Sequence, residues 1–136
     1  MKIAILSRSP QIYSTRRLIE AVEKAGHEVV LIDHTKCHLI MEKGKPSIRI
    51  AGEEIKGIDV IIPRIGASVT TYGAAVIRHF DLMGVPSILT STALIRSRDK
   101  LRSLQVISKS GIGIPKSVFA RHPKADEVKA LIQEVG

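Results

Sequence analysis

Short apolar segments alternate with helical segments along the first 90 residues, and this order limits the possible folds more than any other feature of the sequence. Four segments have the length and apolar character of buried strands: 2–6 (KIAIL), 28–33 (EVVLID), 58–63 (IDVIIP) and 85–90 (VPSILT). Strands joined by helices in this order form a parallel sheet with right-handed crossovers, and the helices cover its faces. The sequence therefore predicts an α/β fold with a doubly wound parallel sheet.

Helical periodicity fills the segments between these strands. Ser14 is placed to cap a helix that runs to Gly26, where glycine supplies the left-handed ending. A second helix is predicted to begin at Thr70 or Thr71. His79 lies on the apolar side of that helix, so we expect it to be a packed, hydrogen-bonded core residue.

The segment between the second and third strands departs from this alternation. A loop is predicted over His34–Pro46, followed by a small hairpin over 47–55 that turns at Ala51-Gly52. The loop begins with HTKCH, in which three side chains could ligate zinc: His34, Cys37 and His38. A tetrahedral zinc site needs a fourth ligand and the sequence offers no second cluster, so we predict no metal site here.

After residue 95 the pattern starts again. Ser97 is placed to cap a helix, 117–120 (SVFA) has the character of a strand, and 125–136 forms another helix. A lone strand has no partner for its backbone hydrogen bonds, so we expect the chain to stop midway through a second domain. The predicted division is an α/β domain over 1–92 and the first elements of another domain over 93–136. Apolar surface exposed on an incomplete domain predicts a homo-oligomer.

The net charge of +8 raises the possibility of nucleic-acid binding, but the pattern of basic residues does not favour it. Aromatic residues make up 3% of the chain, and there is no Trp, so few side chains could stack on bases. The basic side chains are spread along the sequence, at Arg8, Arg16, Arg17, Arg49, Arg64, Arg78, Arg96 and beyond. Such scattered arginines suit phosphate or other anionic ligands equally well.

The expected compartment is the cytoplasm. The single cysteine, Cys37, cannot form an internal disulfide, which fits a reducing environment. The first residues lack the pattern of a secretory signal, and no apolar run approaches the roughly 20 residues that span a bilayer. We therefore expect no membrane partner.

Polar residues directly follow two of the predicted strands, at the sheet edge where α/β proteins bind ligands. Arg64 follows the third apolar segment, and we expect it to contact a substrate carboxylate together with Ser68 or Thr70. The alternative is that Arg64 pairs with a surface acid. Ser7 and Arg8 follow the first strand and are candidates for the same crevice, the alternative being an ordinary strand-to-helix loop.

Three stretches of the sequence resemble one protein family. The segment RSRDKLRSLQVISKSGIGIPKSVFA (96–120) resembles the entry into an ATP-grasp domain, with an Arg-Asp-Lys-rich helix, a Gly-Ile-Pro turn and a strand. Together with AILSRSPQIYSTRRLIEAVEKAGHEV (4–29) and DVIIPRIGASVTTYGAAVIRHFDLMGVP (59–86), it resembles the RimK-type ligases. That resemblance covers essentially the whole chain and implies a Rossmann-like pre-ATP-grasp domain followed by the beginning of an ATP-grasp domain.

The resemblance implies an ATP-dependent carboxylate–amine ligase that adds glutamate to the C-terminus of a small-subunit ribosomal protein. In such enzymes ATP phosphorylates a carboxylate, and an amine then displaces phosphate from the acylphosphate. A lysine at the position of Lys100 reaches the nucleotide phosphates, as suits a compact cation. The implied cofactors are ATP and Mg²⁺, or Mn²⁺, bound mainly by residues beyond Gly136. We therefore expect no catalytic residue and no metal ligand within this chain, and no ligase activity from it alone.

Two alternatives remain open at this stage. A related ATP-grasp ligase could act on a metabolite or a carrier protein instead of a ribosomal protein. A small positively charged domain could also be a non-enzymatic module that binds the ribosome or RNA, and steep salt dependence of RNA binding would indicate it.

Overall fold

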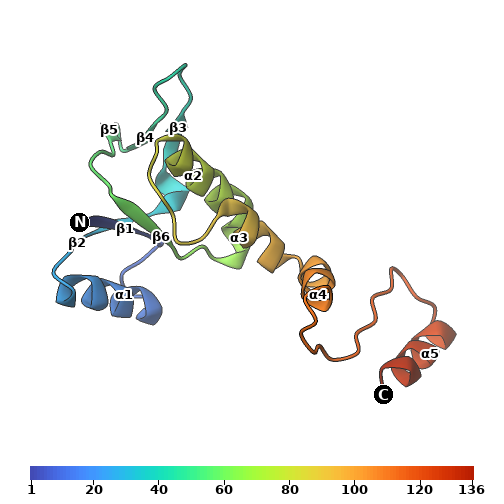
Figure 1. Ribbon diagram of the computed structural model, residues 1–136. Coiled ribbons are helices and arrows are strands. Elements are labelled where there is room, and N and C mark those ends of the chain that lie inside the picture. The colour runs from blue at the N-terminus through green and yellow to red at the C-terminus, as the bar shows by residue number, and fades with distance from the viewer. The chain divides into compact units, whose positions relative to one another are not determined.

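Three of the four predicted strands form one parallel sheet in the computed structural model, which describes residues 1–136. The central strand is β1 (Lys2–Leu6), flanked by β2 (Glu28–Ile32) and β6 (Val60–Pro63), as Figure 1 shows. Both neighbours run parallel to β1, and Ile5 lies opposite Leu31 and Ile62. The predicted parallel sheet is confirmed.

The fourth predicted strand, 85–90, is wrong as a full strand. Ser87 forms a single parallel bridge to Ile61, through hydrogen bonds of 2.9 Å to the Pro86 carbonyl and 3.3 Å from the Ile88 amide. The Ser87 hydroxyl then donates to the Leu89 carbonyl at 2.8 Å and accepts from the Leu89 amide at 3.2 Å. A side chain that bonds to its own neighbouring backbone competes with a strand ladder, and here the local turn ends the pairing.

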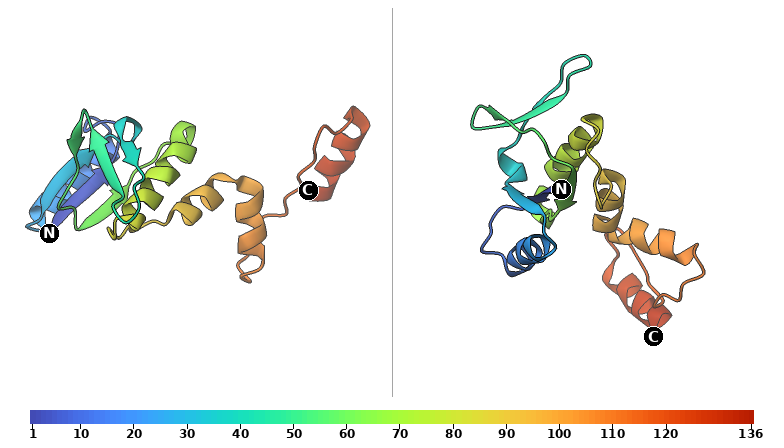
Figure 2. Two further views of the ribbon diagram at one scale, coloured as in Figure 1. Left: turned by 90° about the horizontal axis from the view of Figure 1, so that it is seen from above. Right: turned by 60° about the vertical axis from the view of Figure 1, so that its left-hand side comes forward.

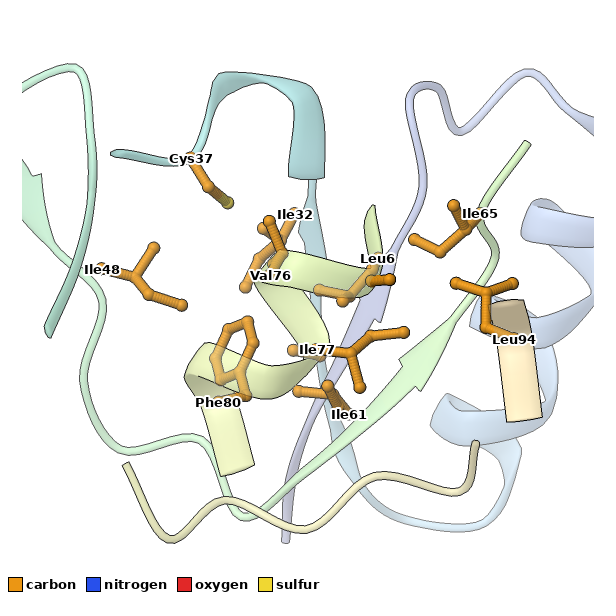
Figure 3. Packing of buried hydrophobic residues seen from close by; sticks show 12 residues of the cluster. Leu6, Ile32, Cys37, Ile48, Ile61, Ile65, Val76, Ile77, Phe80 and Leu94 are labelled. Carbon is orange, nitrogen blue, oxygen red and sulfur yellow. The ribbon is translucent and has the colours of Figure 1, made fainter. Parts of the chain in front are cut away.

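Helices cover both faces of the sheet, as predicted for a doubly wound fold. Helix α1 (Tyr13–Lys24) packs on β1 and β2, and α2 (Thr70–Leu82) lies on the opposite face (Figures 1 and 2). Residues in register point to the same face, so Ala4 and Ile61 meet Phe80 of α2 in one apolar cluster (Figure 3). Burial of this apolar cluster stabilises the sheet at whose carboxyl edge the candidate site lies.

Helix α1 does not begin as predicted. Its first residue is Tyr13, and the preceding Ile12 makes no side-chain capping bond. Ser14 therefore lies inside the first turn, and its hydroxyl accepts a hydrogen bond from the Arg64 guanidinium. The prediction of Ser14 as the helix cap is wrong because this side chain bonds to a distant arginine instead of the first amides of the helix.

A second, antiparallel sheet lies beyond β2. It comprises β3 (His38–Ile40), β4 (Ser47–Ile50) and β5 (Glu53–Glu54). The predicted hairpin is confirmed, and both of its turn residues have positive φ, 50° at Ala51 and 88° at Gly52. Strand β3 lies inside the predicted loop and was missed.

His79 joins this small sheet to α2. The His79 side chain is 3% exposed, and its Nε2 lies 2.9 Å from the Ser47 carbonyl at the start of β4. The prediction of a packed, hydrogen-bonded core histidine is confirmed.

The chain divides into two compact units, Met1–Arg98 and Asp99–Gly136. Helix α3 (Ser91–Arg98) ends the first unit, and residue 92, the predicted end of the first domain, lies within this helix. Two short single turns complete the first unit, at His34–Lys36 and Ala67–Val69. The predicted boundary between family domains stays a prediction.

The second unit contains α4 (Lys100–Ser108) and α5 (Ala125–Val135). Asp99 caps α4 by accepting a hydrogen bond from the Arg102 amide at 2.9 Å, and Ser97 lies inside α3, so the predicted cap at Ser97 is wrong. The predicted strand at 117–120 is also wrong, because the unit holds no other strand to pair with it.

None of the helices is long and apolar enough to span a membrane.

Candidate anion-binding site

A cavity of about 300 Å³ lies at the carboxyl ends of β1 and β6, within the first unit. Three of the residues predicted for a substrate site line it: Ser7, Arg8 and Arg64. The other two, Ser68 and Thr70, lie outside the lining, in the turn before α2 and at its first residue. The structure therefore brings together the polar residues that follow the two strands.

The backbone hydrogen bonds of the sheet continue into this cavity. The Ser7 amide donates to the Ile32 carbonyl at 3.0 Å, and the Arg64 amide donates to the Leu6 carbonyl at 2.8 Å. The Ser7 and Thr15 hydroxyls, both buried, lie 2.7 Å apart and tie the first turn of α1 to the end of β1. The cavity wall is thus built on rigid elements.

Arg64 is oriented by a neutral partner and not by an acid. Its Nη2 donates to the Ser14 hydroxyl at 2.7 Å, and it forms no ion pair in the structure. A guanidinium has five N–H donors, so most of them remain available to a ligand.

A third arginine, which the sequence did not predict, also lines the cavity. Arg98 is the last residue of α3, and its Nη2 donates to the Ile65 carbonyl at 2.6 Å. This bond fixes the residue that follows Arg64. The contact joins residues 33 positions apart, so no local sequence motif could have shown it.

Arg8 reaches the same loop. Its Nη2 lies 3.5 Å from the position that a Cβ atom would occupy at Gly66, which is an ordinary van der Waals distance, so the guanidinium lies directly beside the backbone of this loop. Arg8 itself forms no hydrogen bond or ion pair in the structure.

The cavity is electropositive and contains no acid. Its lining includes three arginines but neither Asp nor Glu. Such a surface attracts anions, and guanidinium groups match the planar geometry of carboxylates and the oxygens of phosphates. The Ser7 hydroxyl is buried and bonded to Thr15, and the Ser14 hydroxyl accepts a hydrogen bond from Arg64. The arrangement can bind and orient an anion.

Two titratable groups, Asp33 and His34, follow β2 in the sequence. Burial lowers the pKa of His34, Asp33 opposes this change, and the positive charge of Arg8 adds to it. Burial alone would raise the pKa of Asp33, but hydrogen bonds from Thr35 and the charges of Lys36 and His34 outweigh it and lower the pKa. His34 is therefore neutral and Asp33 is charged at pH 7.

The residues considered for zinc binding do not converge. Cys37 is 1% exposed, and burial, followed by the charge of Asp33, raises the pKa of its thiol to about 11. Both ring nitrogens of the buried His34 lack a hydrogen-bond partner, and the His38 side chain is exposed. No group of three or more His, Cys, Asp or Glu side chains in residues 1–136 is arranged to hold a metal ion.

Lys100, the residue that the resemblance links to nucleotide phosphates, belongs to the second unit. It is exposed and is the first residue of α4, directly after the capping Asp99.

The sequence of most of the first unit matches a known family. Residues 1–94 match the RimK PreATP-grasp domain family. The chain belongs to this family. The resemblance seen in the sequence is therefore confirmed, and every residue that lines the cavity (the arginine cavity) except Arg98 lies within the matched residues.

Curated relatives of this RimK pre-ATP-grasp chain extend the match over all 136 residues. The chain is 54% identical to a "Probable alpha-L-glutamate ligase" of Marinomonas sp. (strain MWYL1) and to one of Methanococcoides burtonii. Each match covers 100% of this chain and 44% of the relative. The chain thus spans less than half the length of these relatives.

Solved structures of proteins with low sequence identity to this chain share its fold. The ATP-grasp ligase PsnB complexed with its minimal precursor has a TM-score of 0.72 at 17% identity and covers 99% of this chain and 50% of its own. The macrocyclase MdnB of Microcystis aeruginosa MRC has a TM-score of 0.68 at 17% identity, over 98% of this chain and 58% of its own. At these identities the likeness shows the fold alone.

Proposed function

We propose that this chain is the N-terminal part of an ATP-dependent carboxylate–amine ligase that adds glutamate to a protein or peptide. The observation that carries the proposal is the 54% identity, over every residue of this chain, to relatives named as probable alpha-L-glutamate ligases. The remaining 56% of a relative's length would carry most of the nucleotide and metal site. A related structure of PsnB holds Mg and ADP, which supports ATP and Mg²⁺ as the cofactors.

In this proposal the arginine cavity holds a substrate carboxylate. Arg64 is the main ligand, with Ser7 and Arg8 at the neighbouring strand end. Ser68 and Thr70 follow Arg64 in the same loop and would contribute to binding of the carboxylate. The Thr70 hydroxyl donates to the Ala67 carbonyl at 2.9 Å and thereby stabilises the turn in this loop. A charge-assisted hydrogen bond to a carboxylate is about twice as strong as a neutral one, so Arg64 should contribute more to binding than the neighbouring hydroxyl groups.

Lys100 would contact the nucleotide phosphates once the ATP-grasp domain is complete. Its place at the start of a capped helix, exposed and without an acidic partner, supports this role. We further propose that the acceptor is the C-terminus of a ribosomal protein and that the protein works in the cytoplasm as a homo-oligomer. The exposed apolar side chains of the second unit, Phe119 and Ile132 among them, support assembly.

The test joins this chain to the C-terminal part of the Marinomonas relative. The joined protein should form ADP in a reaction that requires both glutamate and an acceptor peptide, and the product peptide should gain the mass of glutamate residues. The 136-residue chain alone should be inactive. A joined protein that folds and binds ATP but adds no glutamate would refute the proposal, and so would turnover by the chain alone.

A further inference from the structure

A second cavity in the first unit is lined by one charged group of each sign. It measures about 190 Å³ and lies between α2 and the segment that leads into α3, two helices that pack against each other. Arg78 and Asp81 of α2 line it, and no other charged side chain does. The arginine cavity has three cations and no acid, so the two cavities suit ligands of different charge.

The charges of Arg78 and Asp81 are not paired with each other. Both side chains are exposed, and neither forms an ion pair in the structure. They lie three positions apart on one helix, which places their Cβ atoms about 5–6 Å apart. A basic residue that precedes an acidic one is the less favourable order for a pair on a helix. The two charges are therefore close neighbours and still available to a ligand.

The other polar residues of this lining carry hydroxyl groups. Ser87 uses its hydroxyl in bonds to the backbone of its own segment, and the Thr90 hydroxyl accepts an amide at the start of α3. The hydroxyls of Ser91 and Thr92 form no hydrogen bond in the structure. Since a hydroxyl both donates and accepts, these two can complete the hydrogen bonds of a polar ligand.

We propose that this second cavity binds a free α-amino acid with an uncharged side chain, in its zwitterionic form. Arg78 pairs with the α-carboxylate and Asp81 with the α-ammonium, while Ser91 and Thr92 bond to the remaining polar atoms. A ligand with both charges on one carbon leaves neither side chain unpaired. A phosphate would lie beside the negative charge of Asp81, and a simple amine would leave Arg78 without a partner.

The same charges disfavour L-glutamate, the amino acid that the proposed function adds to its acceptor. The second carboxylate of L-glutamate finds no second cation in the lining, and it is repelled by Asp81. L-Glutamine has nearly the same shape without that charge. The inference therefore goes beyond the proposed function and does not rest on it, because it adds a site for an amino acid that is not the substrate.

Four small ligands separate the charges that matter. L-Glutamine has one carboxylate and one ammonium, 4-carbamoylbutanoate lacks the ammonium, L-glutaminamide lacks the carboxylate, and L-glutamate has a second carboxylate. NMR titration of the 136-residue chain gives their dissociation constants and maps the amides that shift. A partly exposed ion pair contributes up to about fivefold in affinity. L-Glutamine should therefore bind about fivefold tighter than each of the other three, with shifts at residues 77–92.

Variants then assign each charge of the ligand. Arg78→Gln should lose the preference for L-glutamine over L-glutaminamide, and Asp81→Asn should lose the preference over 4-carbamoylbutanoate and over L-glutamate. Arg49→Gln and Glu23→Gln remove exposed charges that also lack ion pairs but lie outside the lining, so they should keep all three preferences. A purely structural role for Arg78 or Asp81 would weaken all four ligands alike.

Several results would overturn the inference. They are the lack of a saturable shift with L-glutamine, equal affinity for L-glutamine and any of the other three ligands, tighter binding of inorganic phosphate, and shifts confined to the residues of the arginine cavity. Because the titration measures binding alone, a joined protein that adds no glutamate would refute the proposed function and leave this inference standing. Loss of the L-glutamine preferences in a joined protein that adds glutamate would have the opposite meaning.

Discussion

Gly73 is the position where adding one methyl group should disturb the candidate site most. It lies in α2, buried against Ile65 in the cavity wall. A Cβ atom at Gly73 would lie 2.4 Å from Ile65 Cγ2 and 3.1 Å from both Cδ1 and Cγ1, whereas ordinary contacts are 3.4–4 Å. The Ile65 side chain would have to move by about 1 Å, and it is only 7% exposed. The Ile65 carbonyl also accepts the bond from Arg98, so this movement reaches the cavity.

The expected free-energy change follows from two opposing effects. Overpacking a buried site costs about 1–3 kcal/mol. Alanine is favoured over glycine inside a helix by about 1 kcal/mol. Gly73→Ala should therefore lower the free energy of unfolding by about 1 kcal/mol, which corresponds to a fall in Tm of about 4–8 °C for a unit of this size. Binding of an anionic ligand in the cavity should weaken in parallel.

Urea unfolding in two backgrounds tests this reasoning. In the Ile65→Ala background the three clashing carbons are absent, so Gly73→Ala should become stabilising by up to about 1 kcal/mol. The change of sign between backgrounds isolates the contact from helix propensity. If Gly73→Ala stabilises the wild-type chain, or has the same effect in both backgrounds, the packing described here is wrong.

Three further substitutions and one labelling experiment test other parts of the structure. Ser14→Ala removes the hydrogen-bond partner of Arg64 but no helix cap, so the affinity of the cavity for a carboxylate ligand should fall about two- to tenfold. The free energy of unfolding should change by less than about 0.5 kcal/mol, and a loss above about 1 kcal/mol would indicate that Ser14 caps the helix. Asp99→Ala should cost α4 about 1 kcal/mol and reduce its helix content by circular dichroism, and an unchanged spectrum would contradict the cap. Because burial lowers the pKa of His34 from its usual 6.5, the unfolded chain binds a proton there more readily than the folded chain does. The free energy of unfolding, measured by urea titration, should therefore fall as the pH decreases below about 6.5, and His34→Leu should reduce this pH dependence. An unchanged pH dependence in His34→Leu would show that other groups cause it. Burial raises the pKa of Cys37 to about 11, so iodoacetamide at pH 8 should modify it in the urea-unfolded chain and not in the folded one; equal rates would refute its burial.

The sequence predicted those parts of the fold that depend on local pattern and chain order. The apolar runs of β1, β2 and β6 determine the parallel sheet, and its topology places Ser7, Arg8 and Arg64 at one edge without knowledge of any contact. Two of the three cavity arginines could therefore be predicted.

The incorrect or missing predictions concern residues whose structure depends on a distant or competing hydrogen-bond partner. Ser14 has the side chain of a helix cap but bonds to Arg64, and Ser87 has strand neighbours but bonds to its own backbone. Strand β3 is three residues long and is defined by its pairing with β4. Arg98 lines the cavity and donates a hydrogen bond to the Ile65 carbonyl, a contact that no sequence periodicity could indicate.

Substrate binding by Arg64 is tested most directly by the kinetics of the joined protein. The KM for the acceptor peptide should rise about tenfold or more in Arg64→Gln with kcat little changed, because a binding interaction is removed and the reacting groups are not. Arg49→Gln removes the same charge from an exposed position on β4, away from the cavity, and should behave like the wild type. A KM for Arg64→Gln equal to that of Arg49→Gln would contradict a substrate site in the arginine cavity.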